Sequence, residues 1–158
     1  MLEGYTTAGG FEIMLNCDFA IADEEALVGD FHIRRALFGG AGPIYRLPRI
    51  LGMRKAKELM LTGKLMTGRE ATDFGLITDC APAADLDATV DAFVAQLTDK
   101  SPYAMAVTKM ALNRGLDGDT ETLMVLETLA AGLVLESKDA QEGISAFLNK
   151  REAVWTGS

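Results

Sequence analysis

The chain has 158 residues, 49% of them apolar, and a formal net charge of −8. This length suffices for one apolar core, and the acidic balance argues against nucleic acid or an anionic membrane as the main partner. No apolar stretch is long enough for a transmembrane helix and no signal-peptide pattern opens the sequence, so we expect a cytoplasmic protein. The two cysteines, Cys17 and Cys80, are expected to be packed thiols, with a disulfide between them as the alternative.

The most informative segment lies near the N-terminus, where Gly9 and Gly10 precede an apolar helix predicted over 11–17. Glycines let the backbone approach a ligand closely, and the first amides of a helix have no intrahelical partner. Glu12 lies in the first turn, where a carboxylate can move a proton. The pattern therefore predicts either an oxyanion-binding site with an acid/base beside it or an ordinary turn before a helix.

Up to about Pro82, short segments typical of β-strands alternate with helical ones. The expected strands cover 19–22, 27–29 and 76–79. A glycine turn at 39–42 precedes Pro43, which is well placed to begin a helix. This turn lacks the Gly-Lys-Ser/Thr sequence of a phosphate-binding loop, so we interpret it as a turn that leads into a helix.

Between Asp30 and Glu58 the chain is strongly basic and contains no acidic residue. The basic residues are Arg34, Arg35, Arg46, Arg49, Arg54, Lys55 and Lys57. Such a cluster could meet the phosphates of a nucleotide-bearing substrate. The alternative, which we prefer, is that these side chains pair with carboxylates elsewhere in the protein or across a subunit interface.

After Asp85 the pattern is helical throughout. A helix with one apolar face is expected over 86–97, and three more follow. Their N-caps are Ser101, Asp119 and Ser137. The helix over 120–136 is apolar on nearly all sides, which indicates either a subunit interface or the centre of a monomeric core.

Other chemistries are poorly supported. His32 is the only histidine and the two cysteines are far from it in sequence, so no metal site is predicted. No strand is followed by the Gly-x-Ser-x-Gly turn of a serine hydrolase.

A series of short motifs runs along the whole chain in a fixed order. They are Gly4-Tyr5, Ala8-Gly9-Gly10-Phe11-Glu12, Cys17-Asp18-Phe19-Ala20-Ile21-Ala22, Gly39-Gly40-Ala41-Gly42, Arg46-Leu47-Pro48-Arg49, Leu61-Thr62-Gly63, Glu70-Ala71, Gly75-Leu76, Ser101-Pro102, Lys109, Glu142-Gly143, and Ala146-Phe147 through Lys150-Arg151. In this order they resemble the crotonase superfamily, also called the enoyl-CoA hydratase/isomerase family. The resemblance covers almost all of the chain but only the later part of the family's pattern.

The resemblance implies an α/β fold in two parts. Residues 1–82 would form the later turns of the crotonase ββα spiral, and residues 83–158 a C-terminal helical region for trimerisation. Members of the family assemble as trimers or dimers of trimers through such helices. The resemblance therefore implies a homo-oligomer and favours the interface interpretation of the helix over 120–136.

The chemistry implied by the resemblance is stabilisation of a thioester enolate, with an acyl-CoA as the substrate and no cofactor beyond its CoA. Gly9 matches the glycine that supplies one N–H group of the oxyanion hole, and Glu12 matches the first catalytic glutamate. The implied substrate-binding residues are Gly10, Phe31 and Gly40. The second oxyanion N–H group and most CoA contacts belong to a family segment that would precede Met1, so the oxyanion hole is expected to be incomplete in this chain.

The second catalytic glutamate of the hydratases is replaced here. Counting from Glu12, its position is taken by His32, which can act as an acid or a base near neutrality. Asp30 is the nearest other carboxylate, and its spacing is expected to point it elsewhere. Three functions therefore stay open: an enoyl-CoA hydratase/isomerase, a C–C bond hydrolase or lyase of the same superfamily that uses His32, and a non-catalytic oligomeric fragment.

Overall fold

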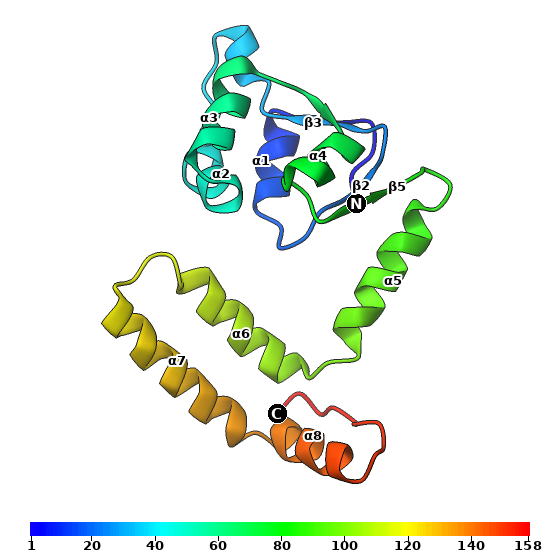
Figure 1. The fold of residues 1–158 in the computed structure, drawn as a ribbon, viewed down its shortest axis with the longest axis vertical. Coiled ribbons are helices and arrows are strands. Elements are labelled where there is room, and N and C mark those ends of the chain that lie inside the picture. The colour runs from blue at the N-terminus through cyan, green and yellow to red at the C-terminus, as the bar shows by residue number, and fades with distance from the viewer. The chain divides into compact units, whose positions relative to one another are not determined.

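The computed structural model describes all residues from 1 to 158, and the chain forms two compact units (Figure 1). Unit 1 comprises Met1–Ala92 and unit 2 comprises Phe93–Ser158. The division falls inside helix α5 (Leu86–Thr98), later than residue 82, where the sequence placed the start of the helical region. None of the helices combines the length and the apolar composition that a membrane crossing requires.

Unit 1 contains two small sheets and the helices around them. Its elements are β1 (Tyr5–Thr7), α1 (Gly9–Leu15), β2 (Ile21–Asp23), β3 (Leu27–Gly29), the 3-10 helix η1 (His32–Arg35), α2 (Pro43–Leu51), α3 (Met53–Thr62), β4 (Met66–Thr67), α4 (Gly68–Phe74) and β5 (Asp79–Ala81). One sheet has the order β1-β3-β4, with β1 parallel and β4 antiparallel to β3. The other sheet pairs β2 with β5 in parallel. Parallel neighbours require a crossover, and the one from β1 to β3 carries α1.

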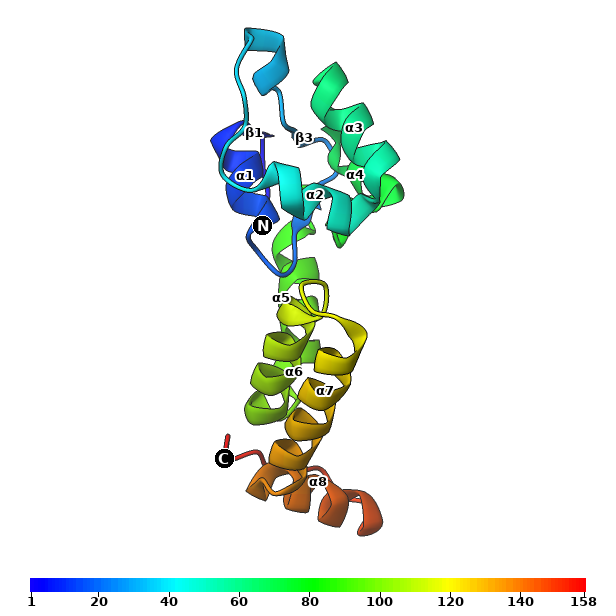
Figure 2. The ribbon, with the colours of Figure 1, turned by 90° about the vertical axis from the view of Figure 1, so that its left-hand side faces the viewer.

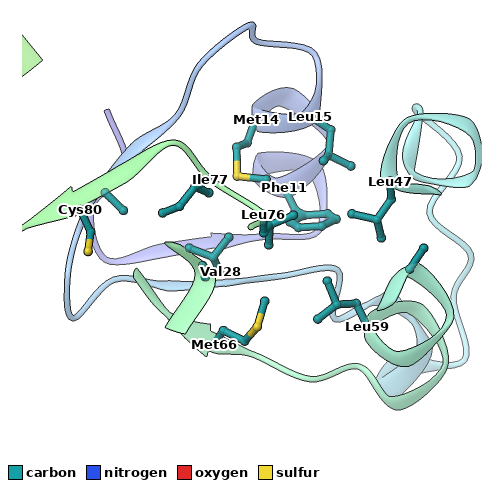
Figure 3. Close-up of a cluster of buried hydrophobic side chains, with 13 residues drawn as sticks. Phe11, Met14, Leu15, Val28, Leu47, Leu59, Met66, Leu76, Ile77 and Cys80 are labelled. Carbon is teal, nitrogen blue, oxygen red and sulfur yellow. The ribbon is translucent and has the colours of Figure 1, made fainter. Parts of the chain in front are cut away.

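The core of unit 1 lies between its helices and the sheet (Figure 3). Phe11 of α1, Leu47 of α2 and Leu59 of α3 are fully buried, and Val28 and Met66 from the β1-β3-β4 sheet belong to the same cluster. Burying each large apolar side chain contributes roughly 1.5–3 kcal/mol. Because Phe11 anchors α1 in this core, the polar residue that follows it is held in a fixed place.

Local sequence signals explain how α4 is attached to the sheets. Its N-cap Thr67 and Glu70 form a capping box, in which Thr67 Oγ1 accepts from the Glu70 amide at 3.1 Å and Glu70 Oε2 accepts from the Thr67 amide at 2.8 Å. Gly68 lies so close to β2 that a Cβ there would come within 2.2 Å of the Asp23 carbonyl oxygen. Glycine is therefore the residue that this contact accepts.

Most of the expected elements are present, with shifted ends. The strand predicted at 27–29 is confirmed as β3, whereas those predicted at 19–22 and 76–79 begin later, as β2 and β5. The helix predicted over 11–17 begins earlier, at Gly9. Strands β1 and β4 were not predicted. Both cysteines are free thiols, so the disulfide alternative is wrong. The expectation of packed thiols is confirmed for Cys80, which is buried, and is wrong for Cys17, which is exposed.

After α5, unit 2 contains the helices α6 (Pro102–Arg114), α7 (Thr120–Leu135) and α8 (Lys138–Leu148), followed by a C-terminal tail. Helices α6 and α7 lie side by side, and α8 contacts both (Figure 2). The three predicted N-caps are confirmed, since Ser101, Asp119 and Ser137 each accept a hydrogen bond from a backbone amide in the first turn.

A buried carboxylate fastens the C-terminal tail to the helices of unit 2. Asp139 of α8 is 1% exposed and accepts hydrogen bonds from Ser101 Oγ at 2.6 Å and from the Thr156 amide at 2.7 Å. The Gly157 amide also donates to it, and the Asp139 amide donates to the Ser158 carbonyl oxygen. The Ser101 hydroxyl, followed by the Thr156 and Gly157 donors, lowers the pKa of Asp139 to about 2 despite its burial.

This arrangement predicts that Asp139→Asn lowers the thermal unfolding temperature and loosens the tail. The amide keeps the shape of the carboxylate but offers one acceptor oxygen where several donors converge. Faster hydrogen exchange at Thr156 and Gly157 would report the loosening. The exposed Glu121→Gln is the control and should change neither measurement.

The same carboxylate gives a pH dependence. A folded pKa of about 2 lies below the ordinary value of 3.8, so the stability that ionised Asp139 contributes is present above about pH 4 and is lost as the pH falls towards 2. Acid unfolding curves should show this loss in the wild-type protein and a smaller one in Asp139→Asn. Identical acid transitions in the two proteins would contradict the assignment.

Candidate functional site

The first part of the site is the junction between β1 and α1. Ala8 has φ 49° and ψ −121°, an unusual conformation for a residue with a Cβ, and it turns the chain sharply before α1 begins at Gly9. The first helical hydrogen bond runs from the Glu12 amide to the Ala8 carbonyl oxygen at 3.0 Å. The amides of Gly9 and Gly10 precede it, both residues are exposed, and nothing lies within 4 Å of where their Cβ atoms would stand. These amides are thus open to a ligand.

The second part is the Glu12 carboxylate, which binds the backbone of the glycine turn at 39–42. Glu12 Oε1 accepts a hydrogen bond from the Ala41 amide at 3.0 Å. Asn16, one helical turn later, donates from Nδ2 to the Glu12 carbonyl oxygen at 2.8 Å and to the Ala41 carbonyl oxygen at 3.4 Å. The glycine turn is therefore held against α1, and Glu12 has one oxygen fixed by a backbone donor.

The third part is a pair formed by Asp30 and His32. Phe31 between them adopts a left-handed conformation with φ 48°, which is rare for an aromatic residue. This bend brings Asp30 Oδ1 to 2.5 Å from His32 Nδ1. The side chain of Asp30 is 2% exposed and that of His32 is 15% exposed.

All three polar side chains meet at Gly39, which is buried. A Cβ on Gly39 would lie 3.0 Å from His32 Nδ1, 3.1 Å from Asp30 Oδ1 and 3.3 Å from Glu12 Oε1. Residues from α1, from the end of β3 and from the start of η1 are thus brought around one point. Two carboxylates and one imidazole at such a point can accept, hold and return protons.

Comparison with known proteins identifies the family. The sequence pattern of the family described as enoyl-CoA hydratase/isomerase matches residues 1–158. The chain belongs to the enoyl-CoA hydratase/isomerase family. It is 35% identical over 157 residues to the enoyl-CoA isomerase/hydratase fer4 of Mycosarcoma maydis, covering 99% of this chain and 57% of that protein. It is 32% identical over 152 residues to the crotonyl-CoA hydratase of Syntrophomonas wolfei, covering 96% of this chain and 58% of that protein.

Solved structures of family members agree with the fold. The crystal structure of enoyl-CoA hydratase from Bacillus anthracis has a TM-score of 0.93 and 34% sequence identity, with 98% of this chain and 60% of that chain covered. The structure of enoyl-CoA hydratase from Mycobacterium tuberculosis also has a TM-score of 0.93, at 30% identity, with 98% of this chain and 62% of that chain covered. The chain thus spans less than two thirds of the length of these family members.

The structure brings together most of the site residues that the sequence predicted. Glu12 and His32 approach the same point, Gly9 and Gly10 open the helix that carries Glu12, and Gly40 follows the glycine at which the polar groups meet. Phe31 is half-buried. The guanidinium groups of Arg34 and Arg35 lie over its ring, at 5.3 Å and 5.7 Å from the ring centroid.

The basic segment is held partly by aromatic rings and carbonyl groups. Arg34 and Arg35 lie over the Phe31 ring, and Lys55 donates to the Phe74 carbonyl oxygen at 2.7 Å while lying over the same residue's ring. Pairing with carboxylates, which the sequence favoured, is thus not the only way in which these cations are held.

The prediction that Asp30 points away from the site is wrong. In an extended chain the side chains of Asp30 and His32 would lie on the same face but too far apart to bond. The left-handed conformation of Phe31 brings them into hydrogen-bond contact. Sequence reasoning also missed Gly39 and the Ala41 amide as parts of the site. The available signal was the glycine turn itself, because glycine has no Cβ and allows a close approach of the backbone.

Gly39→Ala should disturb this convergence. The added methyl group would push against three side chains at 3.0–3.3 Å, two of them linked by a hydrogen bond, and such overpacking costs about 1–3 kcal/mol of unfolding free energy. Chemical denaturation measures the cost. Gly40→Ala is a matched control, because nothing lies within 4 Å of its Cβ position, and it should stay within about 0.5 kcal/mol of wild type. Equal stabilities of the two variants would show that the polar groups do not meet at Gly39.

Proposed function

We propose that this chain supplies the acid/base portion of an acyl-CoA enzyme that stabilises a thioester enolate. The observation that carries the proposal is the position of the Glu12 carboxylate, which accepts a hydrogen bond from the Ala41 amide. Glu12 belongs to helix α1, which begins with the exposed residues Gly9 and Gly10. An oxyanion needs N–H donors, and proton transfer needs a carboxylate held close to them. The family relationship supports an acyl-CoA as the substrate.

In this proposal the thioester carbonyl oxygen accepts a hydrogen bond from the Gly9 amide. Glu12 takes a proton from the carbon next to the carbonyl, and the electron pair of that C–H bond moves to form the enolate. The proton is later returned from Glu12 to carbon. The negative charge develops on the oxygen that faces the helix amides, where it is stabilised most. No cofactor beyond the CoA of the substrate is required by these steps.

A C–C bond hydrolase or lyase is the second candidate, and His32 is the observation that favours it. A hydration that splits one water between two carboxylates cannot run unchanged when one of them is an imidazole. An imidazole beside a buried carboxylate can instead take a proton from water for attack on a carbonyl group. The two candidates share Glu12, the Gly9 amide and the enolate, and they differ in what His32 does.

Exchange of the α-protons of a saturated acyl-CoA into deuterated water tests the proposal without assuming hydration, isomerisation or cleavage. Glu12→Gln should slow this exchange by about 10²–10⁴-fold, the usual contribution of a positioned acid or base, while binding of the acyl-CoA changes little because Gln keeps the shape. Mass spectrometry of the recovered acyl-CoA measures the exchange.

The matched control is Glu25→Gln, which makes the same chemical change at an exposed position. It should exchange at the wild-type rate. If wild-type protein and Glu12→Gln exchange the α-protons at the same rate, Glu12 is not part of the mechanism. Binding of acyl-CoA with no exchange at all, or no binding, would favour the third possibility, a non-catalytic oligomeric fragment.

We also propose that the chain forms a homo-oligomer, a trimer or a dimer of trimers, through unit 2. Within this unit Ala130 is the buried residue of α7, whereas five of its large apolar side chains are exposed. The exposed ones are Met124, Val125, Leu129, Leu133 and Leu135. A helix with so much uncovered apolar surface does not behave as the centre of a monomeric core, and association would remove that surface from water.

Sedimentation at micromolar concentration tests the assembly. The wild-type chain should sediment as a trimer or hexamer, and the double substitution of Leu129 and Leu133 by Glu should dissociate it, since the two residues lie one turn apart on α7. Glu127→Gln on the same helix should leave the assembly intact. A stable wild-type monomer would contradict the proposal.

A further inference from the structure

The role of Asp30 is the feature that the proposed function does not use. Asp30 follows β3 directly, and β3 is fixed on both sides, by β1 in parallel register and by β4. Its residue is 1% exposed. The backbone at the end of a strand that is paired on both edges has little freedom to move. The Asp30 carboxylate that bonds His32 Nδ1 is therefore held in one position.

Burial separates the tasks of the three groups that meet at Gly39. His32 is 15% exposed and Glu12 is half-buried, so both can reach a ligand. Asp30 lies beside the imidazole at 2% side-chain exposure, so it has almost no surface to offer a substrate. Asp30 therefore acts on chemistry only through the ring to which it is bonded.

The chemistry of a carboxylate fixes what it does to that ring. An ionised carboxylate can only accept hydrogen bonds, so the contact at 2.5 Å requires a proton on Nδ1 of His32. In the neutral ring the lone pair then lies on Nε2. A protonated Asp30 would reverse this, donating to Nδ1 and leaving the ring proton on Nε2.

We propose that Asp30 is a positioning residue that holds His32 in the Nδ1–H tautomer, so that Nε2 is the nitrogen left to accept protons. The proposal deepens the proposed function and rests on it for the reaction that His32 serves. It makes the polar group of this site a carboxylate–imidazole pair plus a separate carboxylate, in place of two independent carboxylates.

The proton balance follows from this tautomer. A proton from water or from the substrate goes to Nε2, and the electron pair of the broken bond stays on the oxygen or carbon that loses it. The ring, now carrying protons on both nitrogens, is positively charged and faces the Asp30 carboxylate, which stabilises it through a charge-assisted hydrogen bond. The return of the Nε2 proton to product restores the starting state, and the Nδ1 proton stays in place throughout.

The tautomer can be observed directly because His32 is the only histidine of the chain. In protein produced without a histidine tag and labelled with ¹⁵N at histidine, both imidazole nitrogen signals belong to this ring. Spectra of the ring in its singly protonated form should show Nδ1 protonated and Nε2 unprotonated. Asp30→Asn should lose this preference, because a side-chain amide can donate to Nδ1 and so favour the Nε2–H tautomer.

Turnover supplies the second readout. Asp30→Asn should lower kcat by about 10²-fold or more, within the range of a positioned acid or base, with KM nearly unchanged because Asp30 does not touch the substrate. In protein that already carries His32→Gln, the same substitution should add no further loss, since it acts through the ring. Asp91→Asn, at an exposed position of α5, is the matched control and should behave as wild type.

The outcomes separate this inference from the proposed function. An Nε2–H tautomer in the wild-type protein, an unchanged tautomer in Asp30→Asn, or a full additional loss in the His32→Gln background would overturn it. If Asp30→Asn does not fold, the wild-type spectrum alone decides. The predicted tautomer would support the positioning role of Asp30 even if Glu12→Gln exchanged α-protons at the normal rate. That normal rate would reject only the proposed role of Glu12.

Discussion

The site depends on one close approach, that of the glycine turn at 39–42 to helix α1. Glu12 Oε1 binds the Ala41 amide, and Asn16 binds the Ala41 carbonyl oxygen from the same helix. Because Gly39 has no side chain, the ends of three polar side chains can lie within 3.3 Å of one point beside this turn. A methyl group at that position would separate them. The turn therefore holds the start of α2 against α1, and its Gly39 leaves room for the polar groups to meet.

The surrounding fold serves to hold the two sides of this approach in register. Phe11 buries one face of α1 in the core of unit 1, and the residue after it is Glu12. On the other side, β3 is paired with both of its neighbours and ends just before Asp30. The apolar core and the sheet thus determine where the carboxylates stand, and the helix and the turn bring them together.

The sequence predicted those parts of the fold and site that depend on local patterns. The caps at Ser101, Asp119 and Ser137 were predicted correctly because a cap is a local hydrogen bond between a side chain and the next turn. The position of Asp30 could not be predicted, because it depends on a left-handed Phe31, a conformation that sequence patterns assign to glycine or asparagine. The convergence at Gly39 brings together residues 27 positions apart along the chain, from Glu12 to Gly39, and no periodicity encodes such a contact. Membership of the enoyl-CoA hydratase/isomerase family, by contrast, was evident from the order of the motifs and agrees with the match over residues 1–158.

The central claim is that the Gly9 amide and the Glu12 carboxylate act on the two ends of one enolate. A crystal structure of the protein with an acyl-CoA, or with a stable analogue in which the thioester sulfur is replaced, tests this most directly. We predict the carbonyl oxygen at about 3 Å from the Gly9 amide and the neighbouring carbon facing Glu12, with His32 beside them. An acyl-CoA bound with its carbonyl group remote from the start of α1 would contradict the account.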